Sequence, residues 1–238
     1  MGIEHKEGGD LMYANIVAGK FAVTVDESVA LDASGNLNTN YRVREKEKGA
    51  NKGQKVYEFI FDSVSGMVDR FELRETQFGD QLTLSVKFDG SIVSIGFNAF
   101  NDSGTMTSYA ASIGDQIGLV DFSKELKIGL SKKGGKVRGI ALEQGGVYIP
   151  NSKDNTAFAA HIANRPAPVE TTNLKGEKVW NWEAPSKWQF EQIQAGIARI
   201  IAEGVGNPSE PQASTPAPAA APASDAPKQE EKIDDLPF

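Results

Sequence analysis

Two short stretches of the chain concentrate basic side chains, whose chemistry suits the binding of phosphate groups. Residues 41–57 carry six Lys or Arg against two Glu, a net charge of +4, and residues 124–138 carry six against one Glu, a net charge of +5. Salt screens charges that lie more than about 10 Å away, so a polyanion responds to local charge more than to the total. Both stretches are therefore candidate phosphate-binding surfaces.

A protein that holds unpaired nucleotides also needs flat rings, because stacking on an aromatic side chain contributes about 1–3 kcal/mol per base whatever the base. Tyrosines stand at both ends of the first basic stretch. We predict that single-stranded DNA is contacted by Tyr41, Arg42, Arg44, Lys46, Lys48, Lys52, Lys55, Tyr57, Lys127, Lys132, Lys133, Lys136 and Arg138. The alternative is that these lysines only solubilise loops and protect strand edges.

Signatures of catalysis and of metal binding are missing from the sequence. Cys is absent and only His5 and His161 are present, which excludes disulfides, thiolate zinc sites and a histidine-rich metal site. No phosphate-binding Gly-x-x-x-x-Gly-Lys run and no Gly-x-Ser-x-Gly elbow occurs. We expect no enzymatic activity, no catalytic residues, no metal and no cofactor.

The elements that would position the first basic stretch are two strands and a loop. Residues 14–26 and 56–61 alternate apolar and polar side chains, which predicts two strands that pair with each other. Residues 36–54 between them are rich in Gly, Asn and Lys, which favours a mobile basic loop.

The following residues predict an oligonucleotide/oligosaccharide-binding (OB) barrel. Strands are expected at 64–75, bent near Gly66, and at 81–88 and 91–97; a helix at 105–117; and a closing hairpin over 126–142, extended by 147–149. Three meandering strands, one helix and a closing hairpin match the element order of an OB fold. The predicted fold class is mainly β: a five-stranded OB barrel with extra N-terminal strands, one helix between strands and a C-terminal helix.

The Phe residues in strands and the Trp residues are expected to be structural, whereas Phe78, Phe100, Tyr109 and Tyr148 lie near turns or polar residues, where a ring can stay accessible. Phe residues at 59, 61, 71, 88 and 97 occupy alternating strand positions, which favours the core. Residues 151–185, with Trp180 and Trp182, predict an irregular strap over one end of the barrel. The best helical pattern follows at 186–203, with Ser186 as its N-cap and Gly204 ending it.

The last 33 residues differ from the rest in composition. Residues 206–238 consist mostly of Pro, Ala, Ser, Gln and acids, with a net charge of −4 out of the total of −7. Too few apolar side chains are present to offset the entropy of ordering. We predict a DNA-binding domain over residues 1–205 and a disordered acidic tail over residues 206–238.

The tail ends in a motif with a specific resemblance. Two carboxylates precede an apolar end: Asp234, Asp235, Leu236, Pro237 and Phe238. This tip resembles that of the bacterial single-stranded DNA-binding protein family, in which a low-complexity linker leads to a short acidic run, an aliphatic residue and a terminal Pro-Phe. The resemblance implies that the five residues bind replication and repair enzymes, with the Phe ring in an apolar pocket and the acids facing basic residues.

We therefore expect a protein that binds and protects single-stranded DNA without sequence specificity during replication, recombination or repair, and that recruits partner enzymes through its tip. The core does not match the typical bacterial member, which favours a phage-encoded one. RNA binding, strand annealing and a role as an adaptor without nucleic acid stay open, as does the oligomeric state. The absence of a long apolar run and of a secretory signal predicts no membrane contact and a cytoplasmic location, in the bacterial host if phage-encoded.

Overall fold

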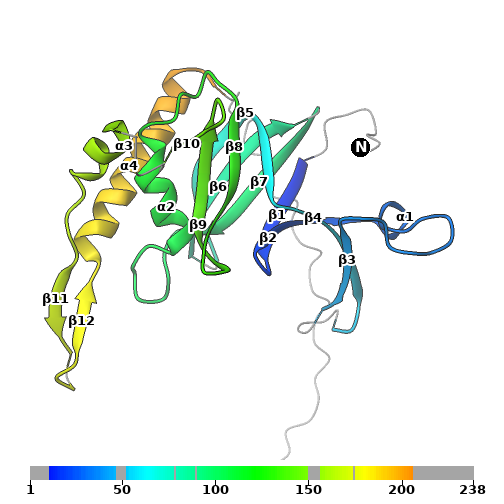
Figure 1. Cartoon of the computed structure of the whole chain (residues 1–238), viewed down its shortest axis with the longest axis horizontal. Helices are drawn as coiled ribbons and strands as arrows, with labels where there is room; N and C mark the ends of the chain where they lie inside the picture. Colours follow the sequence, from blue (N-terminus) through cyan, green and yellow to red (C-terminus); the bar gives the residue numbers. More distant parts are fainter. Residues whose placement is uncertain are drawn as a thin grey trace, which may run out of the picture. The chain divides into compact units, whose positions relative to one another are not determined.

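The computed structural model describes residues 11–46, 52–77, 79–88, 90–149, 156–173 and 175–205. The described chain is mainly β, as predicted, and most of its strands join one mixed sheet in the order β10-β9-β8-β5-β6-β7-β1-β2-β4-β3 (Figure 1). The strands are β1 (Leu11–Val17), β2 (Lys20–Val25), β3 (Tyr41–Glu45), β4 (Lys55–Phe61), β5 (Ser63–Thr76), β6 (Gly79–Phe88), β7 (Ser91–Asn98), β8 (Leu126–Lys133), β9 (Lys136–Gln144) and β10 (Val147–Tyr148).

Strand β5 belongs to both halves of this sheet. Its residues 63–66 pair with β8, and its residues from Met67 onward pair with β6. Gly66 stands at the crossover, where a Cβ atom would lie 1.9 Å from the carbonyl oxygen of Lys87. Three residues later, at Asp69, the register shifts, and the Asp69 carboxylate lies 3.2 Å from the Lys87 ammonium. The predicted bend near Gly66 is confirmed.

The predicted closed OB barrel is not confirmed, because the strand edges that would close it are occupied. The outer edge of β7 pairs in parallel with β1. The outer edge of β9 pairs with β10 at residues 143–144, and the part before them is covered by α2 (Ser108–Ile117). Gln116 donates its amide to Ile140 O at 2.9 Å and accepts from Leu142 N at 2.8 Å, while Ser112 Oγ accepts from Ile140 N at 2.7 Å. A helix side chain thus supplies bonds that a neighbouring strand would make, and the described sheet stays open.

The predicted inter-strand helix is α2, and Thr107 is its N-cap, with a hydroxyl that accepts from Ala110 N at 3.3 Å. It packs against the long C-terminal helix α4 (Glu183–Ala202) at Gly114, where a Cβ atom would lie 2.6 Å from Gln189 O. Ser186 is not the N-cap of α4, because the helix starts one turn earlier and buries the Ser186 hydroxyl against Met106 N at 3.4 Å. The predicted helix end is confirmed at Gly204, with φ of +63°.

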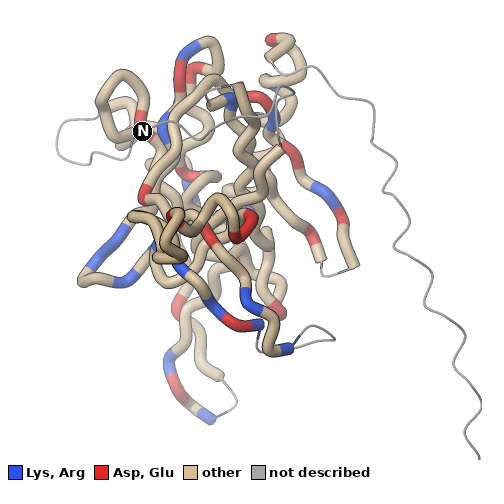
Figure 2. Tube along the Cα trace, turned by 90° about the vertical axis from the view of Figure 1, so that its right-hand side faces the viewer, with Lys and Arg blue, Asp and Glu red and all other residues tan. Residues whose placement is uncertain are grey.

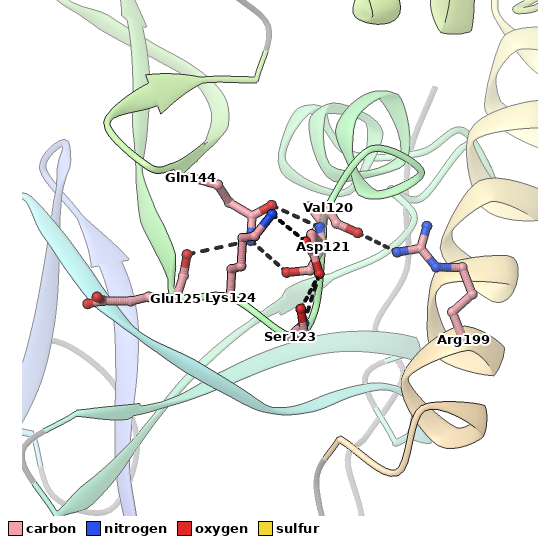
Figure 3. A network of polar contacts seen from close by, with 7 residues as sticks. All are labelled: Val120, Asp121, Ser123, Lys124, Glu125, Gln144 and Arg199. Atoms are coloured by element: carbon pink, nitrogen blue, oxygen red, sulfur yellow. Dashed lines mark hydrogen bonds and ion pairs between the residues drawn. The ribbon is translucent and has the colours of Figure 1, made fainter.

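The loop between α2 and β8 is fixed by polar contacts from α4, from Gln144 of β9 and within the loop itself (Figure 3). Arg199 of α4 donates to the carbonyl oxygens of Gly118 and Val120 and lies 4.8 Å from the centre of the Phe122 ring. Asp121 accepts from the Lys124 ammonium at 2.7 Å and from Ser123. These hydrogen bonds to the charged form lower the pKa of Asp121 to about 2, the Lys124 contact contributing most.

Two predictions for the N-terminal strands are wrong. Residues 14–26 form two strands rather than one, because Ala18 and Gly19 adopt positive φ of 50° and 76° and reverse the chain. The expected loop 36–54 contains strand β3, which pairs with β4; the predicted pairing of β2 with β4 is confirmed. A single helical turn, α1 (Glu27–Ala30), precedes β3.

Residues 156–185 do not form the predicted strap over a barrel. They contain the short helix α3 (Thr156–Ile162) and a separate hairpin of β11 (Val169–Thr172) and β12 (Lys178–Asn181), whose strand residues are all exposed. Of the five Phe residues expected in the core, Phe71 and Phe97 are buried, those at 59 and 61 are half-buried, and Phe88 is exposed. No helix in the described ranges has the length and apolar character needed to cross a membrane.

Candidate nucleic-acid interface

The outer face of β5, β6, β7 and β1 is polar because side chains alternate across the sheet. Phe71, Leu84 and Ile95 point into the core. Their neighbours along the strands lie on the opposite side of the sheet and align in one row: Arg70 opposite Ser85, Ser85 opposite Ser94, and Ser94 opposite Tyr13. The two serines of this row are buried, and their hydroxyl oxygens lie 2.7 Å apart. One rung of the sheet therefore ends in a guanidinium on β5 and in a phenol ring on β1.

This outer face is hollowed. A depression of roughly 100 Å³ is lined by Leu11, Tyr13, Ala14, Asn15, Arg70, Glu72, Arg74, Gln81, Thr83, Ser94 and Gly96. Tyr13 is 63% exposed, so one ring is accessible at its rim. Gly96 has no side chain to fill the depression. A Cβ atom at this position would lie 3.3 Å from Gln81 Nε2. The depression offers an open ring, amide and hydroxyl groups and cations to a ligand.

The charge of this face is small. Glu72 lies 2.9 Å from Arg74 and 3.6 Å from Arg70, so its carboxylate offsets part of the charge of both guanidinium groups. Along much of the trace, Lys and Arg positions stand next to Asp and Glu positions in the same way (Figure 2). Attraction of a polyanion to the hollow therefore needs cations from a neighbouring element.

The hairpin of β8 and β9 supplies such cations, as the sequence predicted. Gly134 and Gly135 form its turn with φ of +60° and +76°. In this hairpin three exposed basic side chains form no ion pair with a described residue: Lys133, Lys136 and Arg138. Two further predicted cations are partly compensated, since Lys127 lies 2.9 Å from Glu143 and Lys132 lies 3.6 Å from Asp62.

The turn between β1 and β2 connects the hollow to this hairpin. Tyr13 on β1 lines the hollow, and a Cβ atom on Gly19 at the turn would lie 3.4 Å from Val137 of β9. Asp62 lies 3.1 Å from the Lys20 ammonium and 3.6 Å from that of Lys132, and the Lys20 contact is the main reason why the pKa of Asp62 is lowered. Tyr13 lies four residues before the end of β1 at Val17, about 13 Å at a rise of about 3.3 Å per residue, and the turn at Ala18 and Gly19 follows.

The first basic stretch has a different arrangement. Arg42 and Arg44 both bind Glu58, each Nε donating to one carboxylate oxygen at 2.7 Å, and Glu58 is only 3% exposed. Glu58 therefore compensates one of their two positive charges within the sheet. The end of this hairpin leaves Lys52 and Lys55 exposed and without an ion pair to a described residue, and Lys46 donates to the side chain of residue 54 at 3.2 Å.

The remaining predicted contact residues of the first stretch are two tyrosines and one lysine. The Tyr57 hydroxyl donates to Glu27, and this bond raises the pKa of Tyr57. The Tyr41 ring lies 5.2 Å from the ring of Phe59 in a half-buried aromatic row. Lys48 lies outside the described residues.

The predicted cations do not form one cluster. Strand β4 begins at Lys55 and ends just before Asp62, which binds Lys132, so the two basic groups lie at opposite ends of a strand about 20 Å long. Sequence reasoning missed Tyr13, Arg70 and Arg74. The alternation of polar residues within the predicted strand 64–75 could have identified the two arginines.

The partner-binding tip, residues 234–238, lies outside the described residues. Within the described ranges, His, Asp and Glu side chains form no group of three or more that could hold a metal ion. Comparison with protein-family models, with curated proteins and with solved structures finds no match to the chain.

Proposed function

We propose that this protein binds single-stranded DNA without sequence specificity, on the outer face of β5, β6, β7 and β1 and along the β8–β9 hairpin. The observation that carries the proposal is the joint presence, on neighbouring elements, of an accessible ring in a polar hollow and of three cations without ion-pair partners among the described residues. Stacking holds bases regardless of identity, and cations hold the phosphates.

The strand order supports this choice of face. Strands β9-β8-β5-β6-β7 follow one another as the strands of an OB fold do, with a helix between the third and fourth in chain order. In OB folds the face of the second and third strands, with the loops beside it, binds oligonucleotides. Here the second and third strands of that order are β6 and β7, whose outer residues Gln81, Thr83 and Ser94 line the hollow. We propose that the sheet is an OB fold opened by β1.

In this mechanism the nucleotide strand lies across the sheet, with one base on Tyr13 and phosphates near Arg74, Lys133 and Lys136. Binding releases counterions, so affinity falls with salt with a slope of about −0.7 per phosphate contacted on a single strand. The acidic tip at residues 234–238 binds replication and repair enzymes by its Phe ring and carboxylates.

Fluorescence anisotropy with labelled oligo-dT over a range of salt tests the proposal. Tyr13→Ala should weaken binding about 5- to 150-fold, from the loss of 1–3 kcal/mol of stacking, whereas Tyr13→Phe should bind like the wild type. Combined Lys133→Gln and Lys136→Gln should lower the salt slope by about 1.4. The matched control is Lys175→Gln with Lys187→Gln, which removes the same charge from exposed positions elsewhere.

Two results would overturn the proposal. Absence of oligo-dT binding by the wild type at low salt favours the adaptor role, in which the sheet carries no nucleic acid. Equal effects of the Lys133/Lys136 pair and of the Lys175/Lys187 pair would show that binding depends on total charge rather than on this face. Competition by RNA and by duplex separates a DNA binder from an RNA-binding or annealing protein.

A further inference from the structure

The β11–β12 hairpin is separate from the large sheet and exposes apolar side chains on both faces. Trp180 is 58% exposed, Trp182 47%, Val169 59% and Val179 39%. Every residue of both strands is exposed, so the described chain provides no cover for them. A lone two-stranded hairpin is marginally stable in water, and three or more strands are needed for independent stability. An element of this kind is typical of a contact surface.

The charge of this hairpin favours protein over nucleic acid. Lys175 and Lys178 are matched by Glu170 and Glu177, so the hairpin carries no net charge. The Lys178 ammonium lies 2.5 Å from the Glu170 carboxylate, across the two strands. A surface without excess positive charge lacks the attraction to phosphates on which sequence-independent binding of nucleic acids depends. Exposed tryptophans on a neutral surface instead suit a protein interface.

We propose that the occupant is a second copy of this chain, joined by antiparallel pairing of β12 with β12 about a twofold axis. One edge of β12 pairs with β11, and its other edge pairs with no described strand. An axis through Trp180 places it opposite Trp180 of the partner subunit. The same register places Lys178 opposite Trp182 of the partner subunit, and Val179 opposite Asn181 of the partner subunit.

Each of these cross-strand pairs is compatible with dimerisation. The paired tryptophans form an aromatic contact at the centre, and the lysine ammonium lies near an indole ring on each side of it. No like charges stand opposite each other within the residues of β12. The two hairpins become one four-stranded sheet, which supplies the additional strands that a lone hairpin lacks. Because both copies use the same surface, the assembly closes as a dimer.

Sedimentation velocity of the full chain from about 1 µM to about 0.1 mM tests the proposal, since this range spans typical dissociation constants of weak dimers. The wild type should pass from monomer to dimer. Trp180→Lys and Trp180→Glu each place like charges opposite one another on the axis, and each variant should weaken dimerisation at least tenfold. An equimolar mixture of the two variants should recover a dimer, because opposite charges then face each other.

The control is the same pair of substitutions at Val147, which is 57% exposed on β10 and outside the hairpin, and should leave dimerisation unchanged. Circular dichroism confirms that each variant is folded. A wild type that stays monomeric throughout, an equal effect of the Val147 variants, or a mixture of the Trp180 variants that stays monomeric would each overturn the proposal. If the Trp180 variants lose oligo-dT binding while the wild type is a monomer, the hairpin is a nucleic-acid contact instead.

Discussion

Replacing Gln116 with Leu removes the side chain that covers the edge of β9 between Ile140 and Leu142. The Gln116 side chain is buried and forms hydrogen bonds of 2.9 Å to Ile140 O and 2.8 Å to Leu142 N. Leu has a similar volume but no polar atom, so one buried carbonyl and one buried N–H lose their partners. Each orphaned group costs about 1–3 kcal/mol, which gives a loss of about 2–6 kcal/mol in the free energy of unfolding.

Urea denaturation followed by circular dichroism measures this loss. With a slope of about 2 kcal/mol/M, the midpoint should fall by about 1–3 M. Gln194→Leu is the matched control, because residue 194 is exposed on α4, and surface changes stay within about 0.5 kcal/mol. A Gln116→Leu protein that unfolds within about 0.5 kcal/mol of the wild type would refute the inference that this side chain replaces a strand.

Three further predictions concern stability. Gly66→Ala should lower the free energy of unfolding, measured by thermal denaturation, by about 3 kcal/mol or more, because a Cβ atom there would lie 1.9 Å from a backbone oxygen. Gly129→Ala is the control, since the nearest atom to a Cβ there is 3.7 Å away. Asp121 has a folded pKa of about 2 against 3.8 for the free group, so it stabilises the fold above about pH 4 and this contribution disappears as the pH falls to 2. Glu58→Gln should lower the free energy of unfolding by about 2 kcal/mol, which is less than the loss for a fully buried ion pair because one arginine partner is 44% exposed. The control Glu45→Gln, at an exposed position, should change the free energy of unfolding little.

Distinct results would contradict these three predictions. For Gly66, the contradicting result is a melting temperature no lower than that of Gly129→Ala. For Asp121, it is a stability difference between the wild type and Asp121→Asn that stays constant from pH 5 to about pH 2. For Glu58, it is equal stability of the Glu58→Gln and Glu45→Gln proteins.

Local signals in the sequence located the elements that depend on local chemistry. The β8–β9 hairpin is confirmed because Gly134 and Gly135 permit positive φ between two alternating strands. The end of α4 at Gly204 is confirmed for the same conformational reason. The turn at Ala18 was missed, because apolar and polar residues continue to alternate through it and Ala rarely adopts a φ of 50°.

Long-range arrangements were not predictable in this way. The parallel pairing of β1 with β7 joins residues about eighty positions apart, and no local sequence pattern predicts it. It places Tyr13 beside the rung that holds Arg70, so the candidate hollow was not foreseen. The sequence did show the charge of Arg42 and Arg44, but only the register of β3 with β4 brings both to Glu58.

The position of β1 has a consequence during synthesis. The β1–β2 hairpin leaves the ribosome early, but the strand that β1 pairs with, β7, is translated only about eighty residues later, a delay of about 4–16 s at 5–20 residues per second. Throughout that interval one side of β1, including the Tyr13 peptide unit, has no partner for its main-chain hydrogen bonds. Nascent chains on neighbouring ribosomes of one mRNA can pair with each other through this unpaired edge of β1. Slower translation between β2 and β7 should therefore increase co-translational aggregation of this protein.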